Sequence, residues 1–424
     1  MRLILVDRLT PKRHHFYPLA LSRPIWDLRC GMTSLGEKLR DRLRGSDVAC
    51  FVPPYLAPVY RRQTAWPVND PKSLLGDDLV VVDGRVKAAG LNPAPQGRSQ
   101  VVLDAGGDVL VARIDRADLA RLQTHSIDAL LESAAGLLPQ AAIPGLPVWN
   151  YTWDLVLANA GQLVEDFRSA GRRGIEGTVE EPSAIRGSRD DLYVARGVVV
   201  HPMVVLDAEH GPIYIDEGAE IHPFSRIEGP CYIGRKSLLL GAKCREGNSI
   251  GPMCRVGGEI EESIIQGCSN KYHDGFLGHA YLGEWVNLGA LTTNSDLKND
   301  YSAVSVVLDG RTPVDTGSTK VGSLIGDHAR TSIGTLFNTG AYVGAMTLIA
   351  TPGNLLPKFI PSFAWFLDGV VTEGFGKQRL YQAAKIAMGR RGRTWTGEDQ
   401  AMWDAVFAMT APERDLAIKR SRQT

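Results

Sequence analysis

A histidine in a polar segment is the residue of this chain best suited to acid–base chemistry. The pKa of a histidine side chain in ordinary surroundings lies near neutrality, so His273 could take a proton from an attacking amine or hydroxyl group. Three further polar side chains lie in or beside the same part of the chain: Asn287, Asn294 and Lys298. A lone histidine often has only a packing or surface role, and that alternative stays open. The segment is a candidate acid–base site.

Metal binding is a second chemistry to consider. His279 follows His273 by six residues, which would be half of a zinc site if the two side chains stacked, but no third histidine has comparable spacing. Asp83 ends the apolar run Leu79–Val82 and could hold a metal ion. The alternative for Asp83, which precedes a glycine, is an ordinary turn position. We therefore keep Asp83 as the candidate metal ligand.

Arginines near the N-terminus could bind phosphate. Arg8 follows the first apolar run, while Arg23 and Arg29 lie in the short segment Ser22–Gly31. A phosphate loop normally contains glycines that let backbone N–H groups approach the phosphate, and the segment 7–15 has none. Either the arginine side chains replace such a loop, or this is a solvated basic surface.

Two patterns indicate how these residues are positioned. Apolar residues recur every six residues between about 197 and 351, as in Ile215, Ile221, Ile227 and Ile233. A six-residue period fits neither an α-helix nor a lone strand, and it is typical of the hexapeptide coils of a parallel β-helix. Many of the 45 glycines fall in this region, where we expect them at turns. The polar interruptions 267–278 and 291–322 are where function is expected.

The remainder of the chain has other sequence patterns. Before residue 175, strand-length apolar runs alternate with helix-like stretches such as 33–43, 118–138 and 153–168, which indicates an α/β domain with a mainly parallel sheet. After Pro361 the pattern is helical, with capping sequences at Thr396–Asp399 and Thr410–Glu413. The expected domains are 1–175 (α/β), 176–196 (linker), 197–360 (β-helix) and 361–424 (helical cap).

Composition excludes several classes. The 424 residues include 47 basic and 47 acidic side chains, and zero net charge argues against a dedicated nucleic-acid or membrane-surface binder. No apolar stretch reaches the roughly 18 residues of a membrane span, and the first residues resemble a buried strand more than a signal peptide. Six cysteines without a C-x-x-C pair fit a reducing compartment. We expect a cytoplasmic protein.

The segment from His273 through 282–290, which reads LGEWVNLGA, resembles the acetyltransferase half of GlmU, the bifunctional bacterial enzyme that makes UDP-N-acetylglucosamine. A shorter branch of sugar nucleotidyltransferases is more similar still. Its hallmarks are found along nearly the whole chain, at Ser22–Gly31, Gly257–Ile260, Ser269–Gly278, Leu297–Asn299, Gly326–His328, Phe337–Gly340 and Lys358–Phe363. The resemblance implies a nucleotidyltransferase-like α/β domain followed by a left-handed parallel β-helix that assembles as a homotrimer.

The resemblance also implies roles for individual residues. His273 matches the general base that deprotonates the amino sugar, and Asn287 matches a substrate-binding asparagine. Phe276 stands where the family has a sugar-contacting tyrosine, and Thr335 matches, two residues out of register, an oxyanion-stabilising serine. Glu261 replaces a phosphate-binding lysine of the family. The glycine-rich loop of the nucleotidyltransferase half is missing altogether.

Three hypotheses follow. The first is a two-domain enzyme of sugar-nucleotide biosynthesis: acetyl-CoA-dependent N-acetylation of an amino-sugar 1-phosphate by the β-helix, with a UTP-using, Mg²⁺-dependent nucleotidyltransferase domain. The second is a sugar-1-phosphate nucleotidyltransferase whose β-helix only oligomerises or regulates. The third is a non-catalytic sugar-phosphate binder, which the missing loop and Glu261 keep open. The sequence names neither the sugar, the base nor the acyl group.

Overall fold

The computed structural model describes residues 1–44, 47–92, 97–141, 145–351 and 353–423. They form two compact units, one of which contains Met1–Phe16, Ser22–Leu28 and Thr33–Asn150. The other contains Tyr17–Leu21, Arg29–Met32 and everything from Tyr151 onward. We call them the α/β unit and the β-helix unit. The strap Arg29–Met32 therefore belongs to the β-helix unit although it lies early in the sequence.

The α/β unit is built on a five-stranded sheet with the order β4-β1-β5-β7-β6. Its strands are β1 (Arg2–Val6), β4 (Asp47–Phe51), β5 (Leu79–Asp83), β6 (Gln100–Leu103) and β7 (Val109–Ile114). β1 pairs in parallel with β4 and β5, but β7 runs antiparallel to both β5 and β6. The sheet is mixed, not mainly parallel as expected, because the short connection from β6 leads directly into the hairpin with β7.

Three α-helices accompany this sheet: α1 (Leu35–Arg42), α2 (Ala57–Gln63) and α3 (Ile127–Leu137). Ser34, not Thr33, caps α1, because its hydroxyl accepts from Glu37 N–H while the Glu37 carboxylate accepts from Ser34 N–H. The expected single helix over 118–138 is a short 3₁₀ turn, Asp118–Arg121, followed by α3. Buried aliphatic residues of β1, β5 and α3 share one hydrophobic core.

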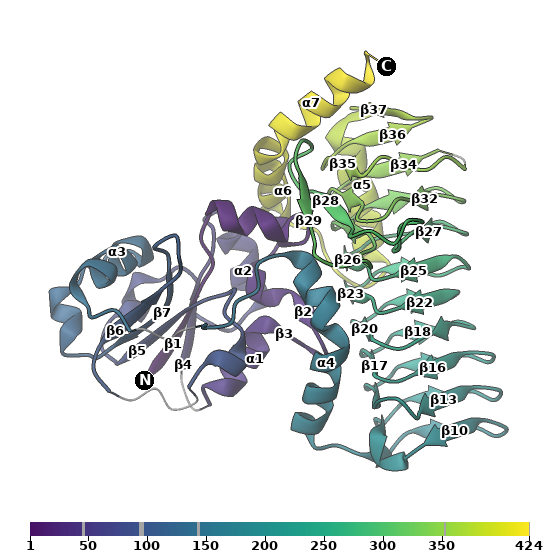
Figure 1. Cartoon of the computed structure of the whole chain (residues 1–424), viewed down its shortest axis with the longest axis horizontal. Helices are drawn as coiled ribbons and strands as arrows, with labels where there is room; N and C mark the ends of the chain where they lie inside the picture. Colours follow the sequence, from purple (N-terminus) through teal and green to yellow (C-terminus); the bar gives the residue numbers. More distant parts are fainter. Residues whose placement is uncertain (45–46, 93–96, 142–144, 352, 424) are drawn as a thin grey trace. The chain divides into compact units, whose positions relative to one another are not determined.

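The β-helix unit confirms the parallel β-helix that the six-residue period predicts, and Figure 1 shows its strands stacked as successive coils. Face 1 is a ten-stranded sheet, which consists of β8 (Gly174–Ile175), β11 (Leu192–Val194), β14 (Ile213–Ile215), β17 (Cys231–Ile233), β20 (Asn248–Ile250), β23 (Ile264–Gly267), β26 (Tyr281–Glu284), β30 (Leu324–Ile325), β33 (Tyr342–Val343) and β35 (Phe359–Ile360).

Face 2 carries β9 (Thr178–Val179), β12 (Val199–Val200), β15 (Glu220–Ile221), β18 (Leu238–Leu239), β21 (Arg255–Val256) and β24 (Asn270–Lys271), and later β31 (Arg330–Thr331), β34 (Leu348–Ala350), β36 (Trp365–Leu367) and β37 (Val370–Thr372). Bridges from Asn287 to Asn270 and to Arg330 connect the two stretches.

Face 3 carries β10 (Ala184–Gly187), β13 (Val205–Ala208), β16 (Arg226–Glu228), β19 (Lys243–Cys244), β22 (Glu259–Glu261), β25 (Phe276–Gly278), β27 (Thr293–Asn294) and β32 (Leu336–Phe337).

Continued beyond Ile233, the six-residue repeat also predicts Leu238 and Phe276 as inward positions, and both predictions are wrong. Leu239, which is fully buried, points inward where the repeat suggested Leu238. Leu277 stacks on Ile260, so Phe276 lies at an outward position of face 3. The number of residues at the corners varies from coil to coil. Because successive side chains of a strand point to opposite sides, a shift of one residue moves an inward side chain to the outside.

Glycines of the β-helix have two roles: some, such as Gly218 (φ 69°) and Gly258 (φ 68°), adopt left-handed backbone as expected at turns, and others allow neighbouring coils to approach closely. A Cβ at Gly251 would lie 2.1 Å from the Gln266 carbonyl oxygen, and one at Gly234 would lie 2.6 Å from the carbonyl carbon of Gly251. Neither residue has positive φ, whereas non-glycine corner residues such as Met253 do (57°). At Gly234 and Gly251 the missing Cβ therefore lets one coil stack on the next.

The boundaries of the β-helix unit differ from the expected ones. Coils begin with β8 at Gly174, so the segment 176–196, expected as a linker, already contains strands of the solenoid. Helix α4 (Thr152–Ala170) belongs to the same unit and packs against β17, β20 and β26 of face 1. Asn159 of α4 donates to the Gly247 carbonyl oxygen at 2.8 Å and accepts from Gly31 N–H at 2.7 Å, so it joins the strap, the helix and the coils.

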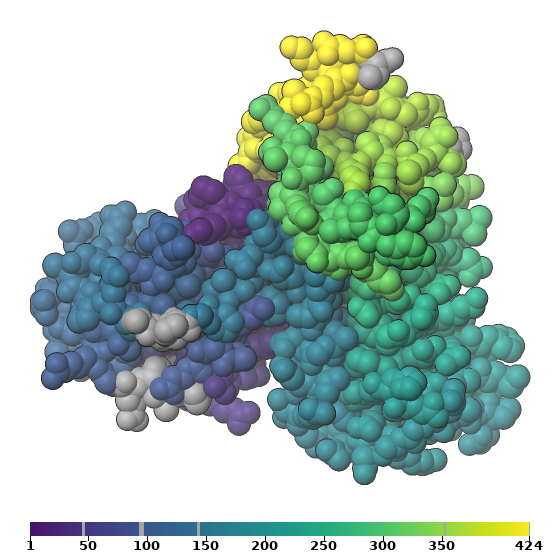
Figure 2. Space-filling view, viewed as in Figure 1, coloured from purple at the N-terminus to yellow at the C-terminus, as the bar shows by residue number. Residues whose placement is uncertain are grey.

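Of the two interruptions expected from the sequence, the first, 267–278, is not found in the described coils. This segment contains β24 and β25, and the corner between them, 272–275, is as long as the corner between β15 and β16. A longer excursion over 291–322 includes the antiparallel hairpin β28 (Ser305–Val307) and β29 (Pro313–Asp315), and Figure 2 shows it in green, standing out from the coils. This second interruption was predicted correctly from the sequence.

Three described helices follow the last coil: α5 (Gly376–Gly389), α6 (Gly397–Met409) and α7 (Ala411–Ser421). α7 packs against β37 at the C-terminal end of the stack, whereas α5 contacts Arg330 of face 2. Thr396 caps α6 in the expected reciprocal arrangement with Asp399. The expected capping box at Thr410 is absent in this described region, because the Thr410 hydroxyl donates to the Val406 carbonyl oxygen of the preceding helix. None of the described helices combines the length and apolar composition that a membrane crossing requires.

Candidate functional site

A ladder of polar side chains on face 2 forms the floor of a cavity in the β-helix unit. Arg255 pairs with Asn270, which pairs with Asn287, which pairs with Arg330. Because residues in register on successive coils of a parallel sheet are stacked, these side chains point in the same direction. Asn270 Nδ2 donates to Asn287 Oδ1 at 3.1 Å, which fixes the two amide groups relative to each other.

The end of helix α5 forms the opposite wall. The cavity measures about 240 Å³, and its lining residues are Arg255, Cys268, Asn270, Tyr272, Trp285, Val286, Asn287, Arg330, Ile386, Ala387, Arg390 and Arg391. Arg391 Nη2 donates to Asn270 Oδ1 at 2.8 Å, and Arg330 Nη2 donates to the Ala383 carbonyl oxygen at 2.8 Å. These two hydrogen bonds hold the helix against the ladder.

The cavity concentrates positive charge. Among the described residues, none of its four guanidinium groups forms an ion pair with a carboxylate; their hydrogen-bond acceptors are carbonyl and amide oxygens. Burial lowers the pKa of Arg255, with a smaller contribution from the nearby charge of Arg391. Burial also lowers the pKa of Arg330. Crowded, partly desolvated cations without a counterion make this cavity suitable for a polyanionic ligand, and Tyr272 and Trp285 add aromatic surface.

His273 lies at the corner beside this cavity. Its side chain is exposed, and its ring centroid lies 4.9 Å from that of Tyr272, a residue of the cavity wall. The backbone carbonyl oxygen of His273 accepts a hydrogen bond from Lys271 Nζ at 2.8 Å. The structure thus brings His273 close to the wall that Asn287 also lines, through Tyr272.

Lys271 was not identified from the sequence. It occupies the inward position that Val256 occupies on the preceding coil, and only 2% of its surface is exposed. Its ammonium group also donates to the Gly257 carbonyl oxygen at 2.8 Å. Burial lowers the pKa of Lys271 to about 8. The signal in the sequence was a lysine at a position where the repeat places an aliphatic, inward side chain. Recognising this position requires the register of the strands of face 2.

In the α/β unit, several ion pairs lie near the carboxyl ends of β1 and β5. Lys12 Nζ contacts Asp104 and lies 2.8 Å from Asp108 Oδ2, and Arg8 Nη2 lies 3.5 Å from Asp108 Oδ1. Asp83 accepts from Arg85 through both carboxylate oxygens, at 3.0 and 3.1 Å.

These aspartates do not fit a resident Mg²⁺ site. Each already binds a basic side chain, and among the described residues Asp83 belongs to no group of three potential metal ligands. The candidate metal role of Asp83 therefore has no supporting geometry.

A buried ion pair connects the two N-terminal segments singled out for phosphate binding. Arg13 Nε lies 3.0 Å from Asp7, and both side chains are almost completely buried. Arg13 Nη2 donates to the Arg23 carbonyl oxygen at 3.1 Å, and Asp7 Oδ2 accepts from Ile25 N–H at 3.1 Å. Arg23 is itself buried in the same unit.

Arg29 belongs to the β-helix unit, so the three arginines of the expected phosphate site are not parts of one unit. Its guanidinium lies 5.5 Å from the ring centroid of Tyr232, and its backbone N–H donates to the Tyr281 hydroxyl at 2.7 Å. These contacts attach the strap to face 1.

Comparisons with known proteins match parts of this chain. Residues 3–173 match the family described as Sugar nucleotidyl transferase. The chain is 33% identical over 113 residues to the bifunctional protein GlmU of Acidovorax ebreus, which covers 26% of this chain and 21% of that protein. It is 33% identical over 150 residues to the bifunctional sugar-1-phosphate nucleotidylyltransferase/acetyltransferase of Sulfurisphaera tokodaii, which covers 33% and 35%. Over these stretches the chain is similar to GlmU-type bifunctional proteins.

The matches span only about a fifth to a third of these relatives. Among solved structures, the UDP-N-acetylglucosamine acyltransferase of Francisella novicida aligns with 57% of this chain and 90% of its own, at 11% identity. The TM-score of 0.30 is too low to identify a shared fold.

Four other candidate site residues of the sequence lie outside the arginine cavity. Asn294 is buried, and its amide group both donates to and accepts from the backbone of Gly278. Thr335 is fully buried and donates to the Ser332 carbonyl oxygen at 2.9 Å. Phe276 is half-buried on face 3, and Lys298 donates to Ser302 and Ala303 within the excursion. None of the four lines the arginine cavity.

Glu261 also departs from the GlmU-like pattern. Its carboxylate is buried and lies 2.8 Å from Arg245 and 3.2 Å from Lys320. Nearby, His279 lies between Asp296, 2.8 Å from Nδ1, and Glu262, 3.2 Å from Nε2. Where the resemblance leads one to expect a phosphate-binding lysine, this chain has a charge-balanced network.

Proposed function

We propose that the chain is an enzyme of sugar-nucleotide biosynthesis whose β-helix unit transfers an acyl group from acyl-CoA to the amino group of an amino-sugar 1-phosphate. The arginine cavity carries this proposal. Its four guanidinium groups lack carboxylate partners among the described residues, and CoA presents several phosphate groups and an adenine ring to such a surface. The acetyltransferase in the name of the Sulfurisphaera tokodaii relative supports the same reaction class.

His273 acts as the general base of the proposed reaction. The substrate amine attacks the thioester carbonyl carbon, His273 accepts the proton that the amine loses, and CoA leaves as the thiolate. The exposed side chain of His273 is accessible to an amine, and Tyr272 connects it to the cavity wall. Asn287 contributes its amide to substrate binding. The charge-balanced surroundings of Glu261 favour a different phosphate contact from the one in the family.

The test is CoA release from acetyl-CoA with glucosamine 1-phosphate as the first acceptor. His273→Ala should lower turnover at least about 100-fold, the contribution expected of a general base, with an unchanged circular dichroism spectrum. His210→Ala is the matched control, because His210 is an exposed histidine of the same solenoid away from the cavity. Unaffected turnover in His273→Ala would exclude this role.

For the α/β unit we propose nucleotidyl transfer between a nucleoside triphosphate such as UTP and a sugar 1-phosphate. The family match over residues 3–173 supports it. Arg8 and Lys12 are the half-buried cations at the carboxyl end of β1 that could meet phosphate. Since the local aspartates bind these cations, Mg²⁺ would have to arrive with the triphosphate. Pyrophosphate release should fall in Arg8→Gln and not in Arg40→Gln, a control on the exposed side of α1.

The paired state of Asp83, Asp104 and Asp108 favours a second candidate, in which the α/β unit binds sugar phosphate without transferring nucleotides. Calorimetric binding of a sugar 1-phosphate with no pyrophosphate release over a panel of triphosphates would support it. The proposed assembly is a homotrimer, which light scattering of the purified chain tests directly.

A further inference from the structure

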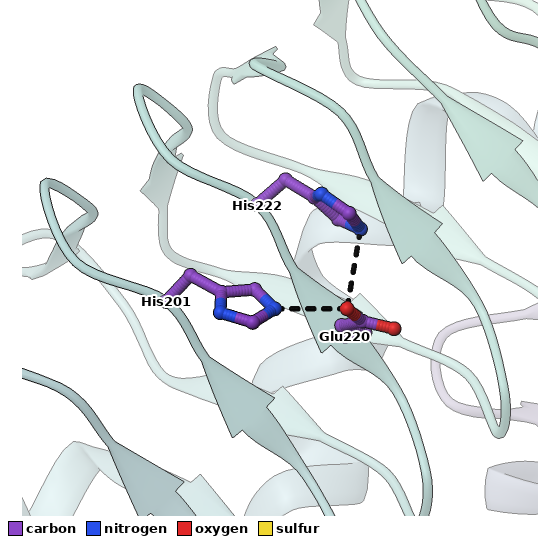
Figure 3. Close-up of side chains that lie close together, drawn as sticks. All are labelled: His201, Glu220 and His222. Atoms are coloured by element: carbon purple, nitrogen blue, oxygen red, sulfur yellow. Dashed lines mark hydrogen bonds and ion pairs between the residues drawn. The ribbon is translucent and has the colours of Figure 1, made fainter.

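Two histidines and a glutamate converge on the outer surface of face 2, as Figure 3 shows. His201 follows β12, while Glu220 and His222 lie two residues apart at either end of β15, so both point to the same side of the strand. β12 and β15 are adjacent and in register, with Val200 opposite Ile221. His201 and His222 therefore occupy the same outward position on successive coils.

The distances suit a metal ion of small radius. His201 Nε2 lies 2.8 Å from Glu220 Oε1, and His222 Nε2 lies 3.4 Å from the same oxygen. One ligand atom from each of the three residues can be chosen so that all lie within 4.8 Å of one another. With metal–ligand bonds of about 2.1 Å, tetrahedral zinc separates its ligand atoms by roughly 3.4 Å. Small side-chain rotations suffice to reach that geometry.

Glu180 provides the outer support that metal-bound histidines usually have. Its Oε2 lies 3.0 Å from His201 Nδ1, on the opposite side of the ring from Glu220. A carboxylate that accepts from Nδ1–H leaves Nε2 as the metal-binding nitrogen and holds the ring in place. Glu180, His201 and His222 are spaced by 21 residues each, one full coil, so they form a single outward ladder.

We propose that His201, Glu220 and His222 bind one Zn²⁺ ion, with Glu180 as the positioning residue of His201. Two imidazole nitrogens and one carboxylate oxygen favour zinc over magnesium or calcium, which prefer all-oxygen ligands. The three side chains are roughly one-third exposed, which leaves the fourth position to water. The ion links the coils of β12 and β15. The site is distinct from the arginine cavity, because β18 separates β15 from Arg255 on β21.

The experiment measures zinc directly on the untagged full-length chain. After exposure to Zn²⁺ and removal of free metal, elemental analysis should find about one zinc per chain, and isothermal titration should show one saturable site. His201→Gln and His222→Gln should each weaken zinc binding at least tenfold. Glu180→Gln should weaken it by about 10- to 100-fold, as second-layer substitutions do. His210→Gln, an exposed histidine near the same coils, should bind zinc as the unaltered chain does.

A second measurement keeps the proposal testable if a variant folds poorly. Co²⁺ added to the unaltered chain should give the intense visible absorption of a four-coordinate nitrogen–oxygen site, and Zn²⁺ should abolish it. Zinc should also raise the melting temperature of the unaltered chain and not that of His201→Gln. No stoichiometric zinc, or zinc retained in a folded double variant His201→Gln/His222→Gln, would overturn the proposal. The three residues would then be an ordinary hydrogen-bonded cluster.

Discussion

Lys271 Nζ donates a 2.8 Å hydrogen bond to the backbone carbonyl oxygen of His273. The lysine reaches this oxygen from inside the β-helix, where neighbouring coils have aliphatic side chains at the same ladder position. Burying an ammonium group costs free energy unless hydrogen bonds offset it, and here the corner of His273 supplies one of the acceptors. The corner that carries the proposed base is thereby tied to a single buried side chain.

The variant Lys271→Met should show whether Lys271 positions the His273 corner or only stabilises the fold. Methionine has similar length and suits the apolar interior, so we expect a stability within about 1.5 kcal/mol of the unaltered chain. CoA release should fall at least tenfold, mainly in kcat, because the His273 corner loses its anchor. The pH profile of the remaining activity should change as well. Lys243→Met, an exposed position on face 3, is the control. Full activity in Lys271→Met would show that the corner keeps its conformation without the lysine.

Arg391→Gln tests the ligand of the arginine cavity. Its guanidinium is held by Asn270 and contributes a charge that no carboxylate of the described residues balances. Removing a charge-assisted hydrogen bond of about 1.5–3 kcal/mol should raise the Kd of acyl-CoA by roughly 10- to 100-fold and reduce the dependence of binding on salt. Arg379→Gln, on the exposed side of α5, should bind acyl-CoA normally. Equal loss in both variants would indicate a non-specific charge effect.

The architecture could be predicted from the sequence because the six-residue period follows directly from burying one side chain per short strand. Inward positions such as Ile215 and Ile233 follow from it, and both are fully buried. Other inward positions could not be assigned from the sequence, because the corners vary in length and a slip of one residue exchanges Leu238 with Leu239 as the buried residue. The arginine cavity could not be predicted, because Arg255, Arg330 and Arg391 meet only when separate coils stack and α5 folds back.

The histidine pair of face 2 shows which spacing was informative. Histidines six residues apart lie at successive corners of the same coil, whereas side chains that stack on each other are separated by a whole coil. That separation is 21 residues between His201 and His222. Coil length varies along this solenoid, so this spacing becomes a signal only once the strands of face 2 are aligned.

Leu239→Ala should destabilise the chain far more than Leu238→Ala. Leu239 is fully buried inside the solenoid, and truncating such a leucine typically costs 2–5 kcal/mol in the free energy of unfolding. Leu238 lies on the outer surface of the same strand and is only half-buried, so we expect a cost below about 1.5 kcal/mol. Chemical denaturation of both variants measures the difference. Similar losses would contradict the register of face 2 described above.

His279 should make stability depend on pH above neutrality. Although burial alone would lower the pKa of His279, hydrogen bonds and charges from Asp296 and Glu262 raise it to about 9, against 6.5 for an unperturbed histidine. Between pH 6.5 and 9 the folded chain keeps a proton that the unfolded chain releases, so this contribution is full below pH 6.5 and is lost as the pH rises through 9. A shift of this size corresponds to about 3 kcal/mol. Comparing His279→Gln with the unaltered chain cancels other titrating groups: the stability advantage of histidine should shrink steadily from pH 6.5 to pH 9. An advantage that stays constant over this range would mean that His279 is neutral in the folded chain.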